Sequence, residues 1–336
     1  MKYPKFVPLL ALLALGAVSA PAQVIKLGTV APEGSPWHTA LLEISQEWAK
    51  LSGGKVQVRI YPGGVAGDES DMLRKIRIGQ LHAAALTSVG LVDIAPDIEA
   101  LYFPTVAKTD DELDLLIGKL GHIWESQMNE KGFEVLTWST AGWVHFFSKE
   151  PVVTPDDLRK RKLVFWGSNA LFIELLQKSG FHPVPLAVTD LLPSLQTGLV
   201  DSFAAPPAAA LSFQWFALAP NMTDFRWMPL PAATVISKKK WEEIPADLRP
   251  KLKEAAAKIG ARVQTQIRSL ETEAVDVMKK HGLKIIPVPP EARKEWERLV
   301  REQGLPVFVG KRFTQERFDE VQRTVDEIRA QQGTGN

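Results

Sequence analysis

Strand and helix patterns alternate in two successive series along this chain, and that alternation limits the folds the chain can adopt. In the first series, strands are expected at residues 24–29, 55–61 and 83–87. Helical patterns that begin at Ser35 and Asp68 separate these strands, and residues 55–61 alternate polar and apolar side chains as a half-buried strand does. A β-α-β-α-β order of this kind predicts a mostly parallel sheet flanked by helices.

A second series of the same type begins near Thr137, so the sequence predicts two α/β units in one chain. Its expected strands and helices lie, in order, at residues 144–148, 162–166, 169–179, 184–186, 189–197 and 200–204. The fold class expected from the two series together is therefore α/β with two similar halves.

A long helix is predicted after the second series. Asp247 is expected to cap it and Gly282 to end it, and one apolar stripe runs along residues 248–281. At 1.5 Å per residue this helix would be roughly 50 Å long, which exceeds one small domain. We expect it to cross both α/β units; the alternative is a pair of helices with a break near Gly260.

The first 22 residues have the features of a secretory signal peptide. Lys2 and Lys5 precede an apolar run over residues 6–15, and small residues follow up to Ala22. The apolar run is far shorter than the ~20 residues that a membrane-spanning helix needs. We expect cleavage after Ala22 and export to the periplasm; the alternative is an uncleaved membrane anchor.

Charge and cysteine content argue against several classes of function. The 40 basic and 39 acidic residues nearly balance, which favours no nucleic-acid partner. The chain has no cysteine, and with it no disulfide, no cysteine nucleophile and no lipid attached to an N-terminal cysteine. It also lacks a G-x-S-x-G elbow, a Walker loop and a G-x-G-x-x-G after a strand, and its six histidines lack metal-ligand spacing. We therefore expect a protein that is no enzyme and that holds no metal or cofactor.

Several segments resemble the substrate-binding proteins of tripartite ATP-independent periplasmic (TRAP) transporters, of the C4-dicarboxylate-binding (DctP-like) type. The resemblance covers about Val24 to Val300 and rests on the order and spacing of the segments VIKLGT, SPWHTA, YPGGVAGDESDMLRKIRIGQLHAA, DDLRKRKLVFWGSNALFIELLQKSG, PVPLAVTDLLPSLQTGLVDSFAAPP and SKKKWEEIPADLRPKLKEAA. It implies a two-lobed, type II-like periplasmic binding protein with two hinge crossings and a helix that spans both lobes. It also implies that the lobes close over a small molecule and that the loaded receptor docks on a membrane permease driven by an ion gradient.

The resemblance also suggests how the chain divides into lobes. Lobe I is expected to hold residues 23–141 and about 231–272, and lobe II residues 142–230 and about 273–325. The remaining residues, 326–336, are expected to form a flexible tail.

The chain departs from the family pattern where relatives hold a carboxylate. Their arginine lies on a strand in a pattern like KIRVP, and the matching residues 162–166 place Val164 at that position. A slipped alignment that brings Arg159, Arg161 or Lys162 there is the alternative, but the Leu-Val-Phe core of the strand favours the first register. A second basic position falls on Trp143 or Val144, depending on the gap.

Two further polar positions of the pattern, a Glu-Asn pair, are apolar here, and a third position has a smaller apolar residue than relatives have. A Glu-Asn pair found in relatives becomes Ala204-Ala205, and Val188 stands where relatives have a phenylalanine of the pocket. A carboxylate without a cationic partner is costly to bury, whereas an apolar ligand gains about 25 cal/mol per Å² removed from water. We therefore predict an apolar or neutral ligand, lipid-like or aromatic. The alternatives are a carboxylate held by other groups, a lipid-shuttling role with a helical-repeat partner protein, and a receptor for an ATP-driven importer or a sensor kinase.

The residues expected to contact the ligand are mostly aromatic or apolar. They are Trp37, Thr87, Ser88, Trp143, His145, Val164, Trp166, Val188, Phe203, Ala205, Trp215 and Phe216. Thr87 and Ser88 have an alternative role as caps of the next helix, and His145 as a histidine satisfied within its strand. Helix capping is the role expected of Asp68 and Glu69.

Overall fold

The first half of the chain forms the predicted parallel sheet. The computed structural model describes residues 22–167 and 170–333. The Ser35 hydroxyl accepts a hydrogen bond from the His38 amide at the start of the first helix, with Pro36 in its first turn, as expected. Strands β1 and β3 pair in parallel, and β1 also pairs with β2. The elements are β1 (Gln23–Thr29), α1 (Pro36–Leu51), β2 (Val56–Tyr61), α2 (Glu69–Arg77) and β3 (Ala83–Thr87).

Helices cover this half before the chain crosses to the other. They are α3 (Ser88–Leu91), α4 (Glu99–Tyr102) and α5 (Asp110–Glu130). Strand β4 (Phe133–Ser148) then runs for 16 residues, far longer than the expected strand at 144–148. Gly142 adopts a φ of 114° next to a register shift in β4, and the glycine is needed because other residues rarely adopt this backbone conformation.

The second half contains the second α/β series. Its elements are α6 (Pro155–Arg159), β5 (Lys162–Trp166), α7 (Ala170–Lys178), β6 (His182–Leu186), the short helix η2 (Val188–Asp190), α8 (Leu191–Thr197), β7 (Ser202–Ala205), α9 (Pro207–Ser212), the short helix η3 (Trp215–Ala217) and β8 (Asn221–Asp224). Strand β5 pairs in parallel with both β6 and β7, as the alternation predicted.

Two long strands connect the halves. Strand β9 (Met228–Ser237) pairs antiparallel with β3 and β4 in the first half, and β4 pairs with β7 and β8 in the second. The resulting strand order is β2-β1-β3-β9-β4-β7-β5-β6. We call the half with β1–β3 lobe I and the half with β5–β8 lobe II; β4 and β9 are the crossings between them.

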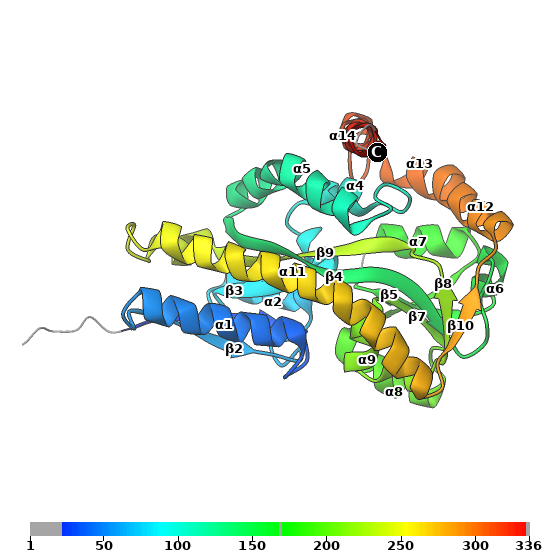
Figure 1. Cartoon of the computed structure of the whole chain (residues 1–336), viewed down its shortest axis with the longest axis horizontal. Coiled ribbons are helices and arrows are strands. Elements are labelled where there is room, and N and C mark those ends of the chain that lie inside the picture. The colour runs from blue at the N-terminus through cyan, green and yellow to red at the C-terminus, as the bar shows by residue number, and fades with distance from the viewer. Residues whose placement is uncertain (1–21, 168–169, 334–336) are drawn as a thin grey trace, which may run out of the picture.

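Helix α11 (Arg249–Lys280) runs unbroken for 32 residues and crosses both lobes (Figure 1). It contacts α1 in lobe I and α9 in lobe II, so the prediction of a spanning helix is confirmed and the alternative of a break is wrong. Gly260 allows close packing, since a Cβ atom there would clash with the Thr137 hydroxyl and crowd the Trp138 carbonyl. The expected cap at Asp247 is wrong: the helix follows Leu248, and no side chain bonds its first amides.

The C-terminal part returns from lobe II to lobe I. Helix α14 lies against α4 and α5 of lobe I (Figure 1) and buries Ile328 completely. We expected residues 326–336 to form a flexible tail, but α14 continues to Gly333 because one of its faces is apolar. The exact lobe boundaries stay a prediction. The elements are α10 (Lys238–Glu242), β10 (Lys284–Pro287), α12 (Pro290–Leu299), a π-helical turn (Val300–Gly304), α13 (Leu305–Phe308) and α14 (Gln315–Gly333).

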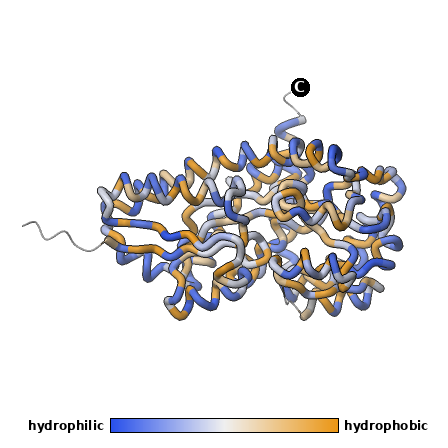
Figure 2. Tube along the Cα trace, turned by 90° about the horizontal axis from the view of Figure 1, so that it is seen from below, coloured by the Kyte–Doolittle hydropathy of each residue, from blue (hydrophilic) through white to orange (hydrophobic). Residues whose placement is uncertain are grey.

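Each lobe has its own apolar interior. Hydrophilic and hydrophobic segments alternate along the outer helices (Figure 2), as expected when one helix face covers a core. Trp48 and Trp241 lie in the lobe I core. Between residues 22 and 333, leaving out 168 and 169, no helix has the length and apolar character needed to cross a bilayer. The expected signal peptide lies outside the described residues except for Ala22.

Candidate functional site

A cavity of about 690 Å³ lies between the two lobes. This volume falls within the roughly 300–1,000 Å³ typical of small-molecule sites. Strands β1 and β3 and helices α1 and α2 contribute lining residues from lobe I, and β5, β6, β7 and α7 contribute them from lobe II. The cavity is therefore the candidate site for a ligand held between lobes.

The lobe II wall of this cavity is apolar and aromatic. Trp166 stacks on Trp215 with 5.6 Å between ring centroids, and Trp215 stacks on Phe213 at 4.3 Å. The Trp166 indole N–H donates to the Ala204 carbonyl at 2.7 Å, so its hydrogen bond is made within the protein. Val164 is also buried in this wall. The wall thus offers ring faces and methyl groups to a ligand.

The lobe I side of the cavity carries a buried carboxyl group. Both oxygens of Glu69 lie 3.0 Å from the Thr87 amide nitrogen, and one lies 2.7 Å from the Gly90 amide nitrogen. Burial raises the pKa of Glu69 to about 7 against the opposing effect of these hydrogen bonds. Asp68 does cap α2, as expected, whereas Glu69 instead ties α2 to the turn after β3.

Charge within the cavity is unbalanced towards acid. Among the described lining residues, Arg312 is the one cationic side chain, and it is already paired with Glu99. Burial raises the pKa of Glu99, although its contacts with Arg312 act in the opposite direction. The other acidic lining residues are Asp68, Glu69 and Asp93. A ligand carboxylate would therefore find no unpaired cation among the described lining residues.

Eight of the twelve expected ligand contacts line this cavity. They are Trp37, Thr87, Ser88, Val164, Trp166, Val188, Ala205 and Trp215. The Thr87 hydroxyl also accepts from the Val89 amide, so it caps α3 while facing the cavity. Direct contact with a ligand stays a prediction for all eight.

The other four expected contacts lie away from the cavity. Trp143 packs beside Ala107 and donates its indole N–H to Asp110, while His145 Nδ1 lies 2.8 Å from the Thr223 carbonyl oxygen. Two more belong to the lobe II core: Phe203, stacked on Phe147, and Phe216. Strand alternation explains three of these positions, because neighbours on the opposite strand face line the cavity, namely Val144, Phe146 and Ala204.

Sequence reasoning missed several lining residues from distant parts of the chain. They are Phe103, Phe146, Phe172, Trp227, Trp296, Phe308 and Arg312. Phe308 and Arg312 follow the stretch that carries the family resemblance, so no motif marked them. Within residues 22–167 and 170–333, no cluster of three or more His, Asp or Glu side chains is arranged to hold a metal ion.

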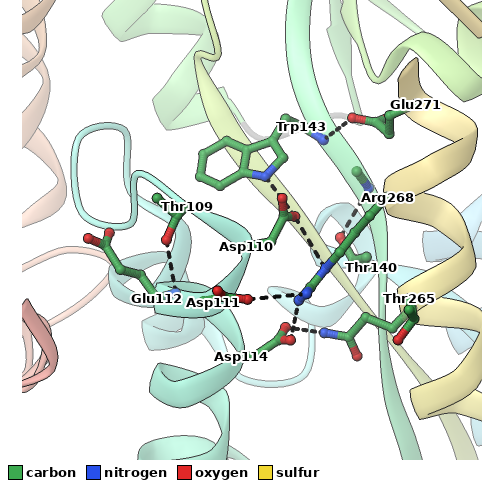
Figure 3. Close-up of polar contacts among 12 residues, drawn as sticks. Thr109, Asp110, Asp111, Glu112, Asp114, Thr140, Trp143, Thr265, Arg268 and Glu271 are labelled. Carbon is green, nitrogen blue, oxygen red and sulfur yellow. Dashed lines mark hydrogen bonds and ion pairs between the residues drawn. The ribbon is translucent and has the colours of Figure 1, made fainter. Parts of the chain in front are cut away.

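A polar cluster surrounds the crossing from lobe I to lobe II on β4. The Trp143 amide donates to Glu271 of α11 at 3.0 Å, and the Trp143 indole donates to Asp110 at 3.0 Å. Asp110 lies between Trp143 and Arg268 (Figure 3), and Arg268 also pairs with Asp111 and Asp114. The cluster therefore ties the spanning helix and the start of α5 to the crossing strand.

Glu271 makes the stability of this crossing depend on pH. Burial raises the pKa of Glu271 to about 7, although the backbone N–H groups of Trp143 and Ala208 act in the opposite direction. Since the folded-state pKa lies above the unfolded value of 4.5, this group's stability contribution is present below pH 4.5 and is lost as the pH rises through about 7.

We expect Glu271→Gln to become more stable relative to the wild type by about 2 kcal/mol between pH 5 and pH 8. The reason is that the amide stays neutral, whereas the wild-type carboxyl must ionise in a buried place. Urea unfolding of both proteins at the two pH values measures the difference. Glu69 titrates in the same range, but it is present in both proteins, so its contribution cancels in the difference between their stabilities. A difference that does not change with pH would contradict the assignment.

A family model and individual relatives place this chain among the same class of binding proteins. The model of the family described as bacterial extracellular solute-binding protein, family 7 (DctP), matches residues 27–304. The C4-dicarboxylate-binding periplasmic protein DctP of Rhodobacter capsulatus is 25% identical over 292 residues, which are 84% of this chain and 87% of that protein.

Solved structures with the same fold include TRAP periplasmic solute-binding proteins. One from Ralstonia eutropha, with bound (S)-2-acetolactate, has a TM-score of 0.84 at 20% identity and covers 91% of this chain and 99% of its own. One from Sulfurospirillum deleyianum, with bound succinate, has a TM-score of 0.81 at 20% identity and covers 90% and 99%. The two-lobed α/β fold expected from the sequence is confirmed.

Proposed function

This chain belongs to the bacterial extracellular solute-binding proteins of family 7, the receptors of TRAP transporters, and from that premise we propose that its ligand is a largely apolar or neutral small molecule. Receptors of this family bind small molecules and deliver them to membrane permease subunits. We further propose that the chain does so in the periplasm, after cleavage of residues 1–22, and without any chemical step.

The charge of the cavity is the observation that carries the proposal on the ligand. Val164 stands where relatives are expected to have an arginine, and it is buried in the cavity wall beside Trp166. Arg312 is the one lining cation among the described residues, and Glu99 neutralises it. An added carboxylate would lose its water without gaining an unpaired cation, which costs several kcal/mol.

Carboxylates bound in relatives favour the competing hypothesis of an acidic ligand. Succinate and (S)-2-acetolactate are ligands of those proteins, whose identity to this chain is 20%. At that identity the likeness concerns the fold, and the ligand depends on the side chains of each cavity. Here the aromatic wall of Trp166, Phe213 and Trp215 favours burial of apolar surface, at about 25 cal/mol per Å².

A neutral fluorescent probe tests the proposal. N-phenyl-1-naphthylamine, whose emission rises in apolar surroundings, is expected to bind the wild type, and succinate and D-glucuronate are expected not to displace it. Val188→Trp should weaken probe binding at least about 10-fold, because a larger ring at this lining residue occupies ligand space. Fluorescence titration with calorimetry of the two acids measures both effects.

Leu199→Trp is the matched control for this titration. Leu199 belongs to the same lobe and is 53% exposed, so the same substitution there should leave probe affinity unchanged. Tight binding of either acid to the wild type, together with no probe binding, would overturn the proposal of an apolar or neutral ligand.

A further inference from the structure

The end of the chain contributes to the cavity although it follows the region that defines the family. The family match ends at residue 304, whereas Phe308 and Arg312 both line the cavity. The chain reaches this place from α12, whose Trp296 stacks on Phe146 of lobe II at 5.1 Å. It then continues into α14 on lobe I. Residues 305–313 therefore pass along the cavity between the two lobes.

Phe308 closes one part of the cavity wall by contacting both lobes. Its ring packs edge-on against Phe103 of lobe I at 5.5 Å and against Phe172 of α7, in lobe II, at 5.2 Å. Phe313 also packs edge-on against Phe103, at 5.8 Å. This aromatic cluster fixes the path of the chain on either side of Arg312.

Arg312 is held by one edge of its guanidinium group. Its Nε lies 2.6 Å from one Glu99 oxygen, and its Nη2 lies 3.1 Å from the other. The two side chains are 17% and 11% exposed, respectively, so the pair is largely desolvated. The hydrogen bonds that Arg312 makes with described residues run through Nε and Nη2. A planar guanidinium that is engaged through Nε and Nη2 leaves its Nη1 edge for another acceptor.

We infer that residues 305–313 are part of the ligand site, and that Arg312 donates a hydrogen bond to the neutral, oxygen-bearing head of an amphipathic ligand whose apolar body lies on the lobe II wall. This inference rests on the proposed function and adds the chemical class of the ligand and its orientation. A hydroxyl or carbonyl oxygen is the head that fits, because it accepts a hydrogen bond without adding charge.

The charges around Arg312 favour such a head over a carboxylate. Glu99 already compensates the guanidinium, and Asp93 and Glu69 also line the cavity. A second carboxylate at Arg312 would place two anions on one cation in a desolvated place. A neutral oxygen gains the charge-assisted hydrogen bond without that repulsion.

The test compares decan-1-ol with decanoate, which share an apolar chain and differ in the head, as competitors of N-phenyl-1-naphthylamine. We expect decan-1-ol to displace the probe from the wild type at lower concentration than decanoate. The double variant Arg312→Met, Glu99→Gln removes the donor without leaving a buried charge. It should weaken decan-1-ol about 10-fold more than it weakens the probe in the same variant, since the bond to a charged donor is lost and the probe has no oxygen to accept it.

The double variant Arg329→Met, Glu112→Gln is the matched control. Arg329 and Glu112 form a pair of the same geometry on lobe I, at 2.9 and 3.1 Å, and they are not among the residues that line the cavity. This variant should bind decan-1-ol as the wild type does. Urea unfolding measures whether both double variants fold. If Arg312→Met, Glu99→Gln does not fold, Arg312→Lys replaces it in the same comparison, because lysine keeps the charge but has a shorter reach.

Three results would overturn the inference. One is equal decan-1-ol affinity in the two double variants, and another is tighter binding of decanoate than of decan-1-ol to the wild type. If the wild type binds no probe, the proposed function fails and this inference fails with it. If it binds the probe but its decan-1-ol affinity does not depend on Arg312, only this inference fails.

Discussion

Replacing Val164 by arginine is expected to destabilise the unliganded protein by about 3–5 kcal/mol, the cost of leaving a buried charge without a partner. Val164 is 3% exposed and lies within the apolar wall of the cavity. The same substitution should also create a site for anions, because a guanidinium matches a carboxylate with two hydrogen bonds. Succinate should therefore restore part of the lost stability, by an amount that grows with the logarithm of its concentration once that concentration exceeds its Kd.

Urea unfolding with and without succinate measures both parts of this prediction. Val164→Met is the control, since it has a long side chain without charge and should cost less than arginine, about 1–3 kcal/mol. Succinate should leave the unfolding of the wild type and of Val164→Met unchanged. An arginine variant as stable as the methionine variant without succinate would show that the wall already accommodates charge, and would contradict the prediction.

Ending the chain at Gly304 is expected to abolish the cooperative folding of lobe I. The deleted segment contributes six buried apolar side chains: Phe308, Phe313, Phe318, Val321, Val325 and Ile328. At about 1.5–3 kcal/mol each, their burial contributes on the order of 10 kcal/mol. That amount is comparable with the whole stability of a typical domain, about 5–15 kcal/mol. Arg312, Arg317 and Arg329 also pair with acidic residues of lobe I and would be lost.

Circular dichroism and urea unfolding check the truncation. Removal of residues 332–336 is the control, because Gln332 and Gly333 are exposed and their loss should not change the unfolding midpoint. A cooperative unfolding transition of wild-type size in the chain ending at Gly304 would show that lobe I folds without α14. That result would contradict the prediction.

Much of the fold was predictable because local chemistry agrees with it. Ser35 and Pro36 mark the start of α1, and the alternation in residues 55–61 marks β2. The crossings were not predictable from such signals. The sequence pattern predicts a strand only at residues 144–148, whereas pairing with β9 extends β4 across Gly142 to Phe133. Strand partners far apart in the sequence leave no local mark.

The apolar character of the cavity wall could be predicted from the sequence, whereas several of the residues that line it could not. Val164 and Trp166 were chosen from the strand on which the family resemblance implies a carboxylate-binding arginine, and both line the cavity. On β4 the structure places Val144 and Phe146, rather than the predicted Trp143 and His145, in the lining of the cavity. A shift of one residue moves every side chain to the other face of a strand. Next to a register shift, the sequence alone does not determine which residues of β4 face the cavity.

Glu99 and Arg312 show a second reason why the site was incomplete. They are 213 residues apart in sequence, yet they form the ion pair that decides the charge of the cavity. Nothing in the spacing of Phe308 and Arg312 along the chain indicates that the turn before α14 lines the cavity. Tertiary packing alone brings this turn to the cavity.

Native mass spectrometry of the protein, purified from its own organism without unfolding, would identify the class of ligand directly. We predict one bound molecule per chain that, once extracted, is uncharged at neutral pH, mainly apolar and carries an oxygen-bearing head. A dicarboxylate or a sugar acid bound in that ratio would contradict this prediction, because the cavity would then hold a charge for which no unpaired cation lines its described wall.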